Sequence, residues 1–363
     1  MKQYYVIGVM SGTSLDGIDV AYSKYFFEND KWNFKLIAAE TYSFNFKILS
    51  LIEETIKNKP KSYKAADIKL GMYYAKIINQ FINEHNIIEI DFVANHGQTV
   101  YHKPAEKITI QLGDGATIAE ITQLTCINNF RNLDVAIGGQ GAPLVPIGDF
   151  HFYNKYNYCI NLGGISNITV QNKNEVVLAY DVSPCNVLLN HYTRQTGFEF
   201  DRDGKIGRSG LFNKPLFNKL NENLYYKKQA PKSLDAQDCI NVFVPIIDEF
   251  DILVEDKLNT IYFHITHQIK TDILKHHKNK NEKVLLSGGG ALNKFLVETI
   301  QHALPIEVFV PATEIIEYKE AIIFGLLGVL KMNNSVNCLK VVTGAVKDNV
   351  GGQIWKPKPQ KKD

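Results

Sequence analysis

Periodic hydrophobic positions divide the first part of the chain into a sheet and its helices. Segments rich in Val, Ile, Phe and Tyr predict strands over residues 4–9, 18–27 and 33–44. A turn at Asn29-Asp30 joins the second segment to the third, so these strands form an antiparallel meander. The same patterns farther along predict helices over 46–57, 62–85 and 116–122, and strands over 108–114 and 126–128. Residues 91–99 predict a short buried strand that ends in a polar, glycine-containing turn.

The second half of the chain repeats this order of elements. Residues 158–170 predict a strand, a Gly163-Gly164 turn and a second strand, and residues 176–180 predict a third strand that ends on Asp181. A later apolar run, part of 284–293, predicts a buried strand that leads into a glycine turn. The shared order indicates an internal duplication of architecture without clear sequence repetition.

A glycine-rich segment, residues 138–143, shows no periodicity and is the predicted crossover between two lobes. We expect an N-terminal lobe of residues 1–134 plus about 340–355, and a C-terminal lobe of residues 135–339. Residues 186–275 of the second lobe are expected to be mostly helical. The fold class that follows is α/β, with duplicated mixed sheets and a central cleft.

Composition narrows the classes of function. The chain has 363 residues, of which 45% are hydrophobic and 21% charged, and its net charge of +2 favours neither nucleic acid nor membrane surfaces. Five widely spaced cysteines without a CxxC pair fit reduced thiols better than a disulfide framework or a zinc site. No secretory signal and no apolar run of about 18 residues is found, so we expect a cytoplasmic protein.

The turn between the first two predicted strands is the first candidate for chemistry. It is made of Gly12, Thr13, Ser14, Leu15, Asp16, Gly17, Ile18 and Asp19. Its backbone N–H groups can form a nest for a polyphosphate, and its carboxylates can hold hydrated magnesium. A surface hairpin with a glycine-rich tip is the other interpretation of this stretch alone. The turns at Gly163-Gly164 and at Gly288, Gly289 and Gly290 favour the phosphate nest.

Glycine turns in both halves indicate a particular kind of ATPase. The first turn and Gly163-Gly164 can hold the two ends of a triphosphate, and Gly288 to Gly290 can lie against the purine and ribose. Neither a Walker sequence with its lysine nor a dinucleotide-type Gly-x-Gly-x-x-Gly follows the first strand. These features predict the two-lobed, ribonuclease H-like fold of the actin-like ATPase superfamily, which includes sugar kinases and Hsp70 chaperones.

Histidines and polar residues elsewhere have two interpretations each. His96, Gln98 and Thr99 follow a predicted strand, and ligands bind at the carboxyl ends of strands in open α/β sheets. A single histidine is more often structural, so His96 stays open between the two roles. His264 and His267 could bind a metal together at their three-residue spacing, but the sequence shows no third ligand.

A series of motifs stands in one order along the chain. They are Met10 to Asp19, His96 to Val100, Gln111 to Gly115, Phe130-Arg131, Gly138 to Pro146, Asn161 to Asn167, Gly288 to Asn293, Glu320-Ala321 and Thr343 to Ala345. With these motifs the chain resembles the anhydro-N-acetylmuramic acid kinase family over nearly its full length.

The resemblance implies a specific reaction. Such an enzyme opens the 1,6-anhydro ring of anhydro-N-acetylmuramic acid with water and transfers the γ-phosphoryl group of ATP to the freed O6. The product is N-acetylmuramic acid 6-phosphate, an intermediate of cell-wall recycling. By resemblance, Asp181 is the general base, Arg131 steadies negative charge, Mg²⁺ lies near Asp16 or Asp19, and the protein is a homodimer. Sugar contacts are implied for His96, Gln98, Thr99, Asn186 and Glu320.

The chain departs from the family pattern on the sugar side. The usual Asp-Thr-Gly-Pro-Gly-Asn is here Asp181-Val182-Ser183-Pro184-Cys185-Asn186, so both glycines are replaced. If those glycines provided a positive φ or a close approach to the sugar, the backbone or the pocket must differ. A kinase for a related anhydro or amino sugar is therefore one alternative, and a nucleotide-binding regulator without transfer activity is another.

Overall fold

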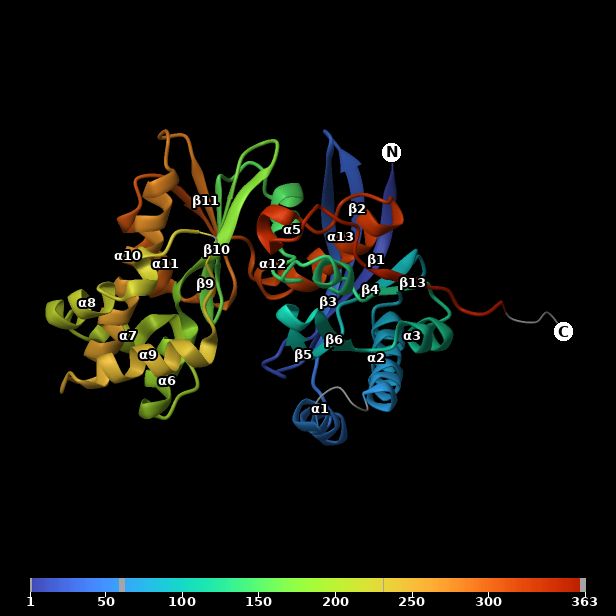
Figure 1. Cartoon of the computed structure of the whole chain (residues 1–363), viewed down its shortest axis with the longest axis horizontal. Coiled ribbons are helices and arrows are strands. Elements are labelled where there is room, and N and C mark those ends of the chain that lie inside the picture. The colour runs from blue at the N-terminus through green and yellow to red at the C-terminus, as the bar shows by residue number, and fades with distance from the viewer. Residues whose placement is uncertain (1, 59–62, 231, 360–363) are drawn as a thin grey trace. The chain divides into compact units, whose positions relative to one another are not determined.

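Contacts between α-carbons divide the chain into two compact units. Unit 1 comprises residues 1–152 and 318–363, and unit 2 comprises residues 153–317. The computed structural model describes residues 2–58, 63–230 and 232–359, and Figure 1 shows their arrangement, with labels on many of the helices and strands. Each unit has its own sheet and its own hydrophobic core.

The sheet of unit 1 is the predicted meander, extended by parallel strands. Its members are β1 Gln3–Met10, β2 Ile18–Glu28, β3 Lys31–Tyr42, β4 Phe92–Asn95, β7 Cys126–Asn128 and β13 Gln353–Trp355. The order across the sheet is β13-β7-β4-β1-β2-β3. β1, β2 and β3 are antiparallel neighbours, whereas β4 is parallel to both β1 and β7. β1 is buried on both faces from Val6 to Met10, which explains its unbroken apolar sequence.

Helices cover this sheet and bury apolar stripes against it. Those of unit 1 are α1 Phe46–Asn58, α2 Lys64–Glu84, α3 Gly115–Thr122, α4 Asn132–Ala136, α5 Pro146–Phe152, α13 Lys319–Met332 and α14 Lys340–Thr343. α2 buries Leu70, Tyr74 and Phe81 at near-helical spacing. α13 is buried almost all the way round, as its apolar sequence predicts.

Unit 2 repeats the sheet topology of unit 1. Its strands are β8 Tyr158–Leu162, β9 Ile165–Gln171, β10 Val176–Pro184, β11 Lys283–Ser287 and β12 Glu307–Phe309, in the order β10-β9-β8-β11-β12. β8, β9 and β10 form an antiparallel meander, and β11 is parallel to β8 and β12. The predicted duplication of mixed sheets is therefore confirmed.

The helical part of unit 2 also follows the prediction. Its helices are α6 Asn186–Thr193, α7 Lys205–Ser209, α8 Lys214–Asn221, α9 Ala236–Asp248, α10 Val254–His276, α11 Lys294–Ala303 and α12 Thr313–Glu317. α10 carries Ile261, Ile265 and Ile269 at a spacing of four residues, and all three are fully buried in the core of unit 2.

Two predicted strands differ from the structure. The strand expected over 108–114 is β6 Ile108–Leu112, which pairs with β5 Gln98–Lys103 in a separate hairpin and not with the main sheet. The strand expected to end on Asp181 continues to Pro184. Asp181 therefore lies inside β10, beside an irregularity in its pairing with β9.

The glycine-rich segment 138–143 is not the crossover between the units. The chain passes between them at residues 152–153 and 317–318, so residues 135–152 and 318–339, expected in the second lobe, belong to unit 1. The α-carbon contacts of α13 explain part of this difference, because the helix packs on β1, β2 and β4.

A buried carboxylate explains the glycines of segment 138–143. Asp134 accepts hydrogen bonds from the backbone N–H of Gly141 and from the Thr343 hydroxyl and Asn349 amide, each at 2.8 Å. A Cβ at Gly139 would overlap the Asp134 carboxylate. The segment is glycine-rich because it wraps closely around this side chain.

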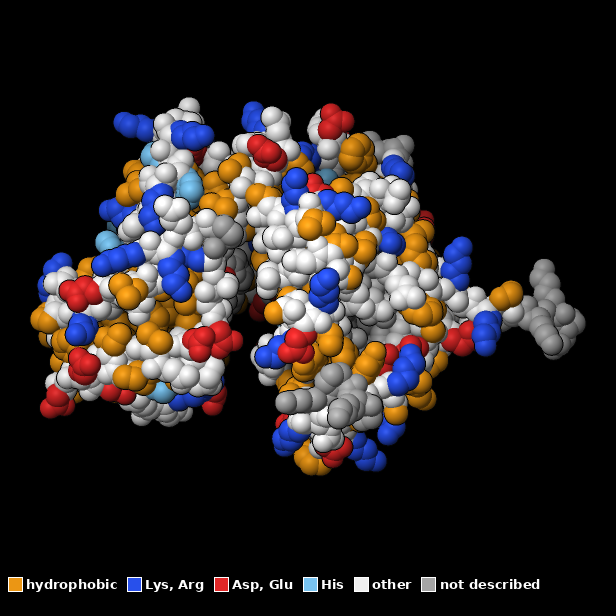
Figure 2. Space-filling view, viewed as in Figure 1, with side chains coloured by type: hydrophobic (Ala, Val, Ile, Leu, Met, Phe, Trp, Pro, Cys, Tyr) orange, Lys and Arg blue, Asp and Glu red, His pale blue; other side chains and the backbone are white. Residues whose placement is uncertain are grey.

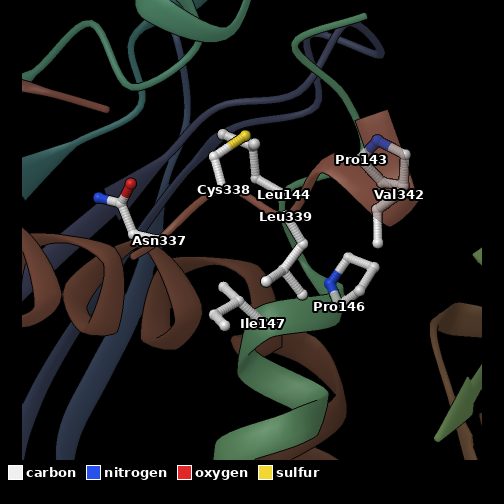
Figure 3. Close-up of a pocket in the computed structure, with 8 residues that line it drawn as sticks. All are labelled: Pro143, Leu144, Pro146, Ile147, Asn337, Cys338, Leu339 and Val342. Carbon is white, nitrogen blue, oxygen red and sulfur yellow. The ribbon is translucent and has the colours of Figure 1, made fainter. Parts of the chain in front are cut away.

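A small, shallow hollow lies nearby in unit 1 (Figure 3). Its lining is largely apolar and comprises Pro143, Leu144, Pro146, Ile147, Asn337, Cys338, Leu339 and Val342. The Cys338 thiol also contacts Asp134, at 3.1 Å. The hollow therefore lies beside the contacts that hold segment 138–143 against the C-terminal part of the chain.

The distribution of surface charge and the state of the cysteines agree with the nearly neutral net charge and the widely spaced cysteines of the sequence. Charged side chains of both signs are mixed over the visible face of each unit (Figure 2). Cys126, Cys159, Cys185, Cys239 and Cys338 are all free and buried. Within the described ranges, no helix has both the length and the apolar composition needed to cross a membrane.

Small residues let α13 approach the sheet of unit 1 very closely. A Cβ added to Gly8 in β1 would overlap the carbonyl oxygen of Ala321, and one added to Gly325 would overlap the hydroxyl of Tyr25. The Tyr25 hydroxyl donates to the Ile322 carbonyl at 2.6 Å and is fully buried. The first two turns of α13 are thus fixed to β1 and β2 by backbone-close packing.

We predict that Gly8→Ala destabilises the protein. The new methyl group must displace α13, and overpacking of this kind costs about 1–3 kcal/mol of unfolding free energy. Chemical denaturation measures the loss. Gly164→Ala is the matched control, because Gly164 is exposed and no described atom lies within 4 Å of its missing Cβ. Equal stability of the two variants would contradict the packing argument.

Candidate functional site

The first turn joins β1 to β2 and presents polar groups outward. Thr13, Ser14 and Asp16 are exposed, and the Leu15 N–H donates to the Gly12 carbonyl at 3.3 Å. Leu15 has a φ of 59°, in the left-handed region that residues with a side chain rarely adopt. Strained backbone often occurs where a loop binds a ligand, so the turn stays a candidate for the predicted anion nest.

Buried hydrogen bonds hold the first turn from beneath. The Gln98 amide donates to the Gly12 carbonyl at 3.0 Å, and Gln98 is fully buried. The hydroxyls of Ser11 and Tyr74 lie 2.5 Å apart, and the Ser11 hydroxyl also donates to the Gly97 carbonyl at 3.3 Å. Gln98, for which the sequence predicts a sugar contact, supports the first turn in this structure.

Three carboxylates share one electrostatic neighbourhood in unit 1. Asp19 accepts a hydrogen bond from the Thr41 hydroxyl at 2.7 Å, and Asp16 is exposed. Glu320 lies in the first turn of α13. Burial raises the pKa of Glu320, the positive charges of Arg131 and Lys319 oppose that rise, and the negative charges of Asp19 and Asp16 add to it. In the described ranges, no group of three or more His, Cys, Asp or Glu side chains is placed to ligate a metal directly.

Arg131 is held by the end of β4 and by the glycine-rich segment. Its Nε–H donates to Nε2 of His96 at 3.0 Å, and its Nη1 donates to the Gly141 carbonyl at 2.6 Å. His96 is 4% exposed and packs on Phe324 of α13, with ring centroids 4.6 Å apart. The structure thus brings together two residues predicted for the site, and adds Gly141 and Phe324.

Thr99 lies on the hairpin formed by β5 and β6. Its hydroxyl accepts a hydrogen bond from the Gln111 amide at 3.3 Å, and its side chain remains partly accessible. The Gln111 amide also donates to the Thr109 hydroxyl at 2.8 Å. Thr99 therefore belongs to a row of polar groups on the hairpin and stays a candidate sugar contact.

The second glycine turn lies between β8 and β9 and is tied to the start of α6. The backbone N–H groups of Cys185 and Asn186 donate to the carbonyls of Gly164 and Gly163, at 2.9 and 3.2 Å. The Asn186 side chain donates to the Leu162 carbonyl at 3.0 Å. Asn186, like Gln98, thus supports a glycine turn in this structure. The matching roles follow from the duplicated topology.

The glycines of the third turn serve two different needs. A Cβ at Gly288 would lie 2.5 Å from Asn161 Oδ1, and one at Gly290 would lie 2.7 Å from the Leu162 Cβ. Gly288 also has a φ of 76°. Gly289 is exposed, and no described atom lies within 4 Å of its missing Cβ. Packing against β8 thus explains Gly288 and Gly290, and Gly289 is the one of the three that leaves open space.

Asp181 is held in β10 by a segment far away in sequence. Its Oδ2 accepts the Leu234 N–H at 2.9 Å, its own N–H donates to the Lys232 carbonyl at 3.1 Å, and its carbonyl accepts the Tyr225 hydroxyl at 2.6 Å. Burial raises the pKa of Asp181, and the Leu234 N–H opposes that rise. No local pattern in the sequence pointed to Leu234 or Tyr225.

The residues that replace the two family glycines fit their places. The Ser183 hydroxyl lies 3.0 Å from the hydroxyl of Ser166. The Ser166 hydroxyl can also donate to the Ser183 carbonyl, likewise at 3.0 Å. Cys185 has a φ of −132°, and Ser183 is not among the residues with positive φ. Both side chains are fully buried. Neither position requires glycine for its backbone conformation.

The histidine pair on α10 does not form a metal site. His264 Nε2 lies 2.7 Å from the Tyr226 hydroxyl, and His264 Nδ1 lies 2.9 Å from the Asn221 amide oxygen. Both ring nitrogens are therefore engaged by protein groups. Burial lowers the pKa of His264 to about 3, which keeps the ring neutral. Its role is structural.

A family model for anhydro-N-acetylmuramic acid kinase matches residues 4–357. The chain belongs to the anhydro-N-acetylmuramic acid kinase family. Membership confirms the predicted resemblance, the phosphotransferase class and the kinase function at the level of the family.

Curated relatives of the same name match over nearly the whole chain. The anhydro-N-acetylmuramic acid kinase of Francisella tularensis subsp. novicida is 35% identical, over 98% of this chain and 99% of the relative. That of Bacillus thuringiensis subsp. konkukian is 31% identical, over 97% of this chain and 99% of the relative. The similarity therefore spans both units.

Solved structures resemble the chain more weakly. The activator of 2-hydroxyisocaproyl-CoA dehydratase from Clostridium difficile, with bound ADPNP, has a TM-score of 0.45 and 12% identity, covering 89% of this chain and 93% of its own. A ROK family glucokinase from Streptomyces griseus, in complex with glucose and AMPPNP, has a TM-score of 0.40 and 9% identity, covering 89% and 98%. Likenesses at this level carry no argument about function.

Alanine substitutions at the third turn should separate packing from ligand binding. We predict that Gly290→Ala lowers the thermal unfolding temperature, because its Cβ must push against Leu162. Gly289→Ala should unfold like the wild type yet raise KM for ATP several-fold, because the methyl group occupies open space. Thermal unfolding and steady-state kinetics measure the two effects. A Gly289→Ala variant with unchanged KM would show that no ligand approaches this backbone.

Proposed function

We propose that this chain opens the 1,6-anhydro ring of anhydro-N-acetylmuramic acid with water and transfers the γ-phosphoryl group of ATP to O6. The product would be N-acetylmuramic acid 6-phosphate, for cell-wall recycling. Full-length family membership supports the proposal. The structural observation that carries it is Asp181, a carboxylate of raised pKa on β10, next to the strand that begins at the Gly163-Gly164 turn.

Asp181 is suited to act as the general base of ring opening. In this step the water oxygen bonds to the anomeric carbon, the bond from that carbon to O6 breaks, and the water proton passes to Asp181. O6 then bonds to the γ-phosphorus as the bond to ADP breaks. A carboxylate with a raised pKa is a stronger base than a solvated one, and among the described residues the Leu234 N–H donates to this carboxylate.

The proposal assigns ATP to the three glycine turns. Gly164 and Gly289 leave open space beside the backbone, which suits the approach of phosphate and nucleoside groups. Asp16 and Asp19 would hold hydrated Mg²⁺, which neutralises phosphate charge when bound. The Thr41 hydroxyl orients Asp19 for this role. Arg131 would steady negative charge on the substrate.

The identity of the sugar follows from the family and from the replaced glycines. Ser183 and Cys185 are fully buried, so neither side chain adds a new group to an open surface of unit 2. This observation favours the family's own substrate over a related anhydro or amino sugar. A panel of sugars ranked by kcat/KM separates the two, and preference for another sugar would establish the alternative.

The decisive experiment is a product assay. The protein is incubated with ATP, Mg²⁺ and anhydro-N-acetylmuramic acid, and the 6-phosphate is sought by mass spectrometry. Omitting the sugar serves as the control for unproductive ATP hydrolysis. Absence of the product from folded protein that still binds ATP would leave a nucleotide-binding regulator as the better description.

We predict opposite effects of Asp181→Asn on activity and on stability. Loss of the base should lower kcat by about 10²- to 10⁴-fold. The pKa of Asp181 is raised from its ordinary 3.8, so the folded chain binds more protons than the unfolded chain above that pH, and ionisation lowers stability as pH rises. Asparagine removes this cost and retains an oxygen that can accept the Leu234 N–H.

Thermal unfolding at two pH values tests the stability half of this prediction. Asp181→Asn should unfold at a higher temperature than the wild type at pH 7, with the difference shrinking toward pH 4. Asp251→Asn, at an exposed position, is the matched control. Full sugar-dependent turnover by Asp181→Asn would remove Asp181 from the mechanism.

We also propose a cytoplasmic homodimer. The substrate ATP and the five free cysteines fit a reducing compartment that contains nucleotide. Sedimentation at several protein concentrations measures the oligomeric state, and a constant monomer mass would remove the dimer from the proposal.

A further inference from the structure

The contacts of Arg131 divide the N–H donors of its guanidinium group into those that bind the protein and those that remain. An arginine side chain has five N–H donors in a fixed plane. Two contacts bind it to the protein, through Nε to His96 and through Nη1 to the Gly141 carbonyl. The plane also lies near the Phe324 ring, with Cζ 5.9 Å from the centroid. These contacts fix the direction in which the remaining donors point.

His96 has the properties of an acceptor dedicated to Arg131. It is 4% exposed, and burial and the positive charge of Arg131 hold its pKa well below the usual range. The ring is therefore neutral, with its proton on Nδ1, because Nε2 accepts the Arg131 Nε–H. A ring nitrogen that already accepts this bond does not bind a sugar hydroxyl as well.

The backbone of His96 is fixed as firmly as its ring. Its N–H donates to the Val9 carbonyl of β1 at 2.9 Å, two residues before Ser11 opens the first turn. The ring rests on Phe324 of α13. Because β1 and α13 hold His96 in place, they also determine where its ring meets the guanidinium of Arg131.

We propose that His96 is the positioning residue of Arg131, and not a ligand of the sugar. The neutral imidazole orients the guanidinium so that its unoccupied donors meet the negative charge that develops on the substrate. The assignment of that charge to Arg131 rests on the proposed function, whereas the orientation itself does not. The role predicted for His96 from the family resemblance is thereby replaced by an indirect one.

Two substitutions at His96 separate the acceptor from the packing. His96→Phe keeps an aromatic ring against Phe324 but removes the acceptor nitrogen. His96→Gln places an amide oxygen within reach of the Arg131 Nε–H. We expect kcat to fall about 10- to 100-fold in His96→Phe, from loss of a charge-assisted hydrogen bond, with much of it restored in His96→Gln. KM for the anhydro sugar should change less than kcat.

A double-mutant cycle with Arg131→Ala tests the dependence on Arg131. In the Arg131→Ala background, His96→Phe should lower kcat less than 2-fold, because the group that it positions is gone. An equal loss in both backgrounds would overturn the proposal. So would a rise in KM for the sugar at constant kcat, which would identify His96 as a sugar ligand.

A spectroscopic measurement keeps the test independent of the reaction. In ligand-free protein, the Arg131 Nε–H resonance should be protected from solvent exchange, lose that protection in His96→Phe, and regain it in His96→Gln. Absence of protection in the folded wild type would refute the hydrogen bond itself. If the protection behaves as expected but the product assay fails, the proposed function is wrong and the positioning of Arg131 stands. Thermal unfolding of each variant confirms that the compared proteins are folded.

Discussion

The contact on which unit 1 depends is the close approach of α13 to β1. Gly8 has no side chain, so the Ala321 carbonyl lies where a Cβ would be. Glu320 immediately precedes Ala321 and thus shares the electrostatic neighbourhood of Asp16 and Asp19. Phe324 follows one turn later and packs on His96. A helix late in the chain and the first strand are therefore brought into contact through a single glycine.

Glycines in this protein divide into those that serve packing and those that leave open space. Gly8, Gly288 and Gly290 are required because other parts of the chain occupy the space of their Cβ atoms. Gly164 and Gly289 border open space, so packing against the described residues does not explain their missing side chains. The sequence alone does not distinguish these two groups of glycines. The distinction needs the atoms around each residue.

The sequence predicts most of the secondary structure because its apolar periodicity is strong. The meander of β1, β2 and β3 and the long helix α2 agree with the pattern to within a few residues, and α10 lies in the segment that was expected to be mostly helical. The hairpin of β5 and β6 was only half predicted, since Gln98 to Lys103 alternates weakly. The crossover was misplaced because glycine-rich sequence suggests a linker, whereas segment 138–143 wraps a buried aspartate.

The sequence motifs identified candidate site residues but did not identify their hydrogen-bond partners. The motifs pointed to Gln98, His96 and Asn186, yet their contacts with Gly12, Arg131 and Leu162 arise from chain segments that lie far apart or across a turn. Such partners depend on tertiary packing, which local patterns do not encode. In both units a side-chain amide, from Gln98 or Asn186, donates to a carbonyl at a glycine turn.

Asp181 shows why these supports matter for chemistry. A carboxylate disfavoured by burial destabilises the fold when it ionises, and it would relax toward water if its strand could move. Three backbone or hydroxyl contacts from Tyr225, Lys232 and Leu234 oppose that movement. They fasten the backbone more than they stabilise the charge, since Leu234 alone among them donates to the carboxylate. Asp181 thus combines a raised pKa with a backbone that is held in place by these contacts.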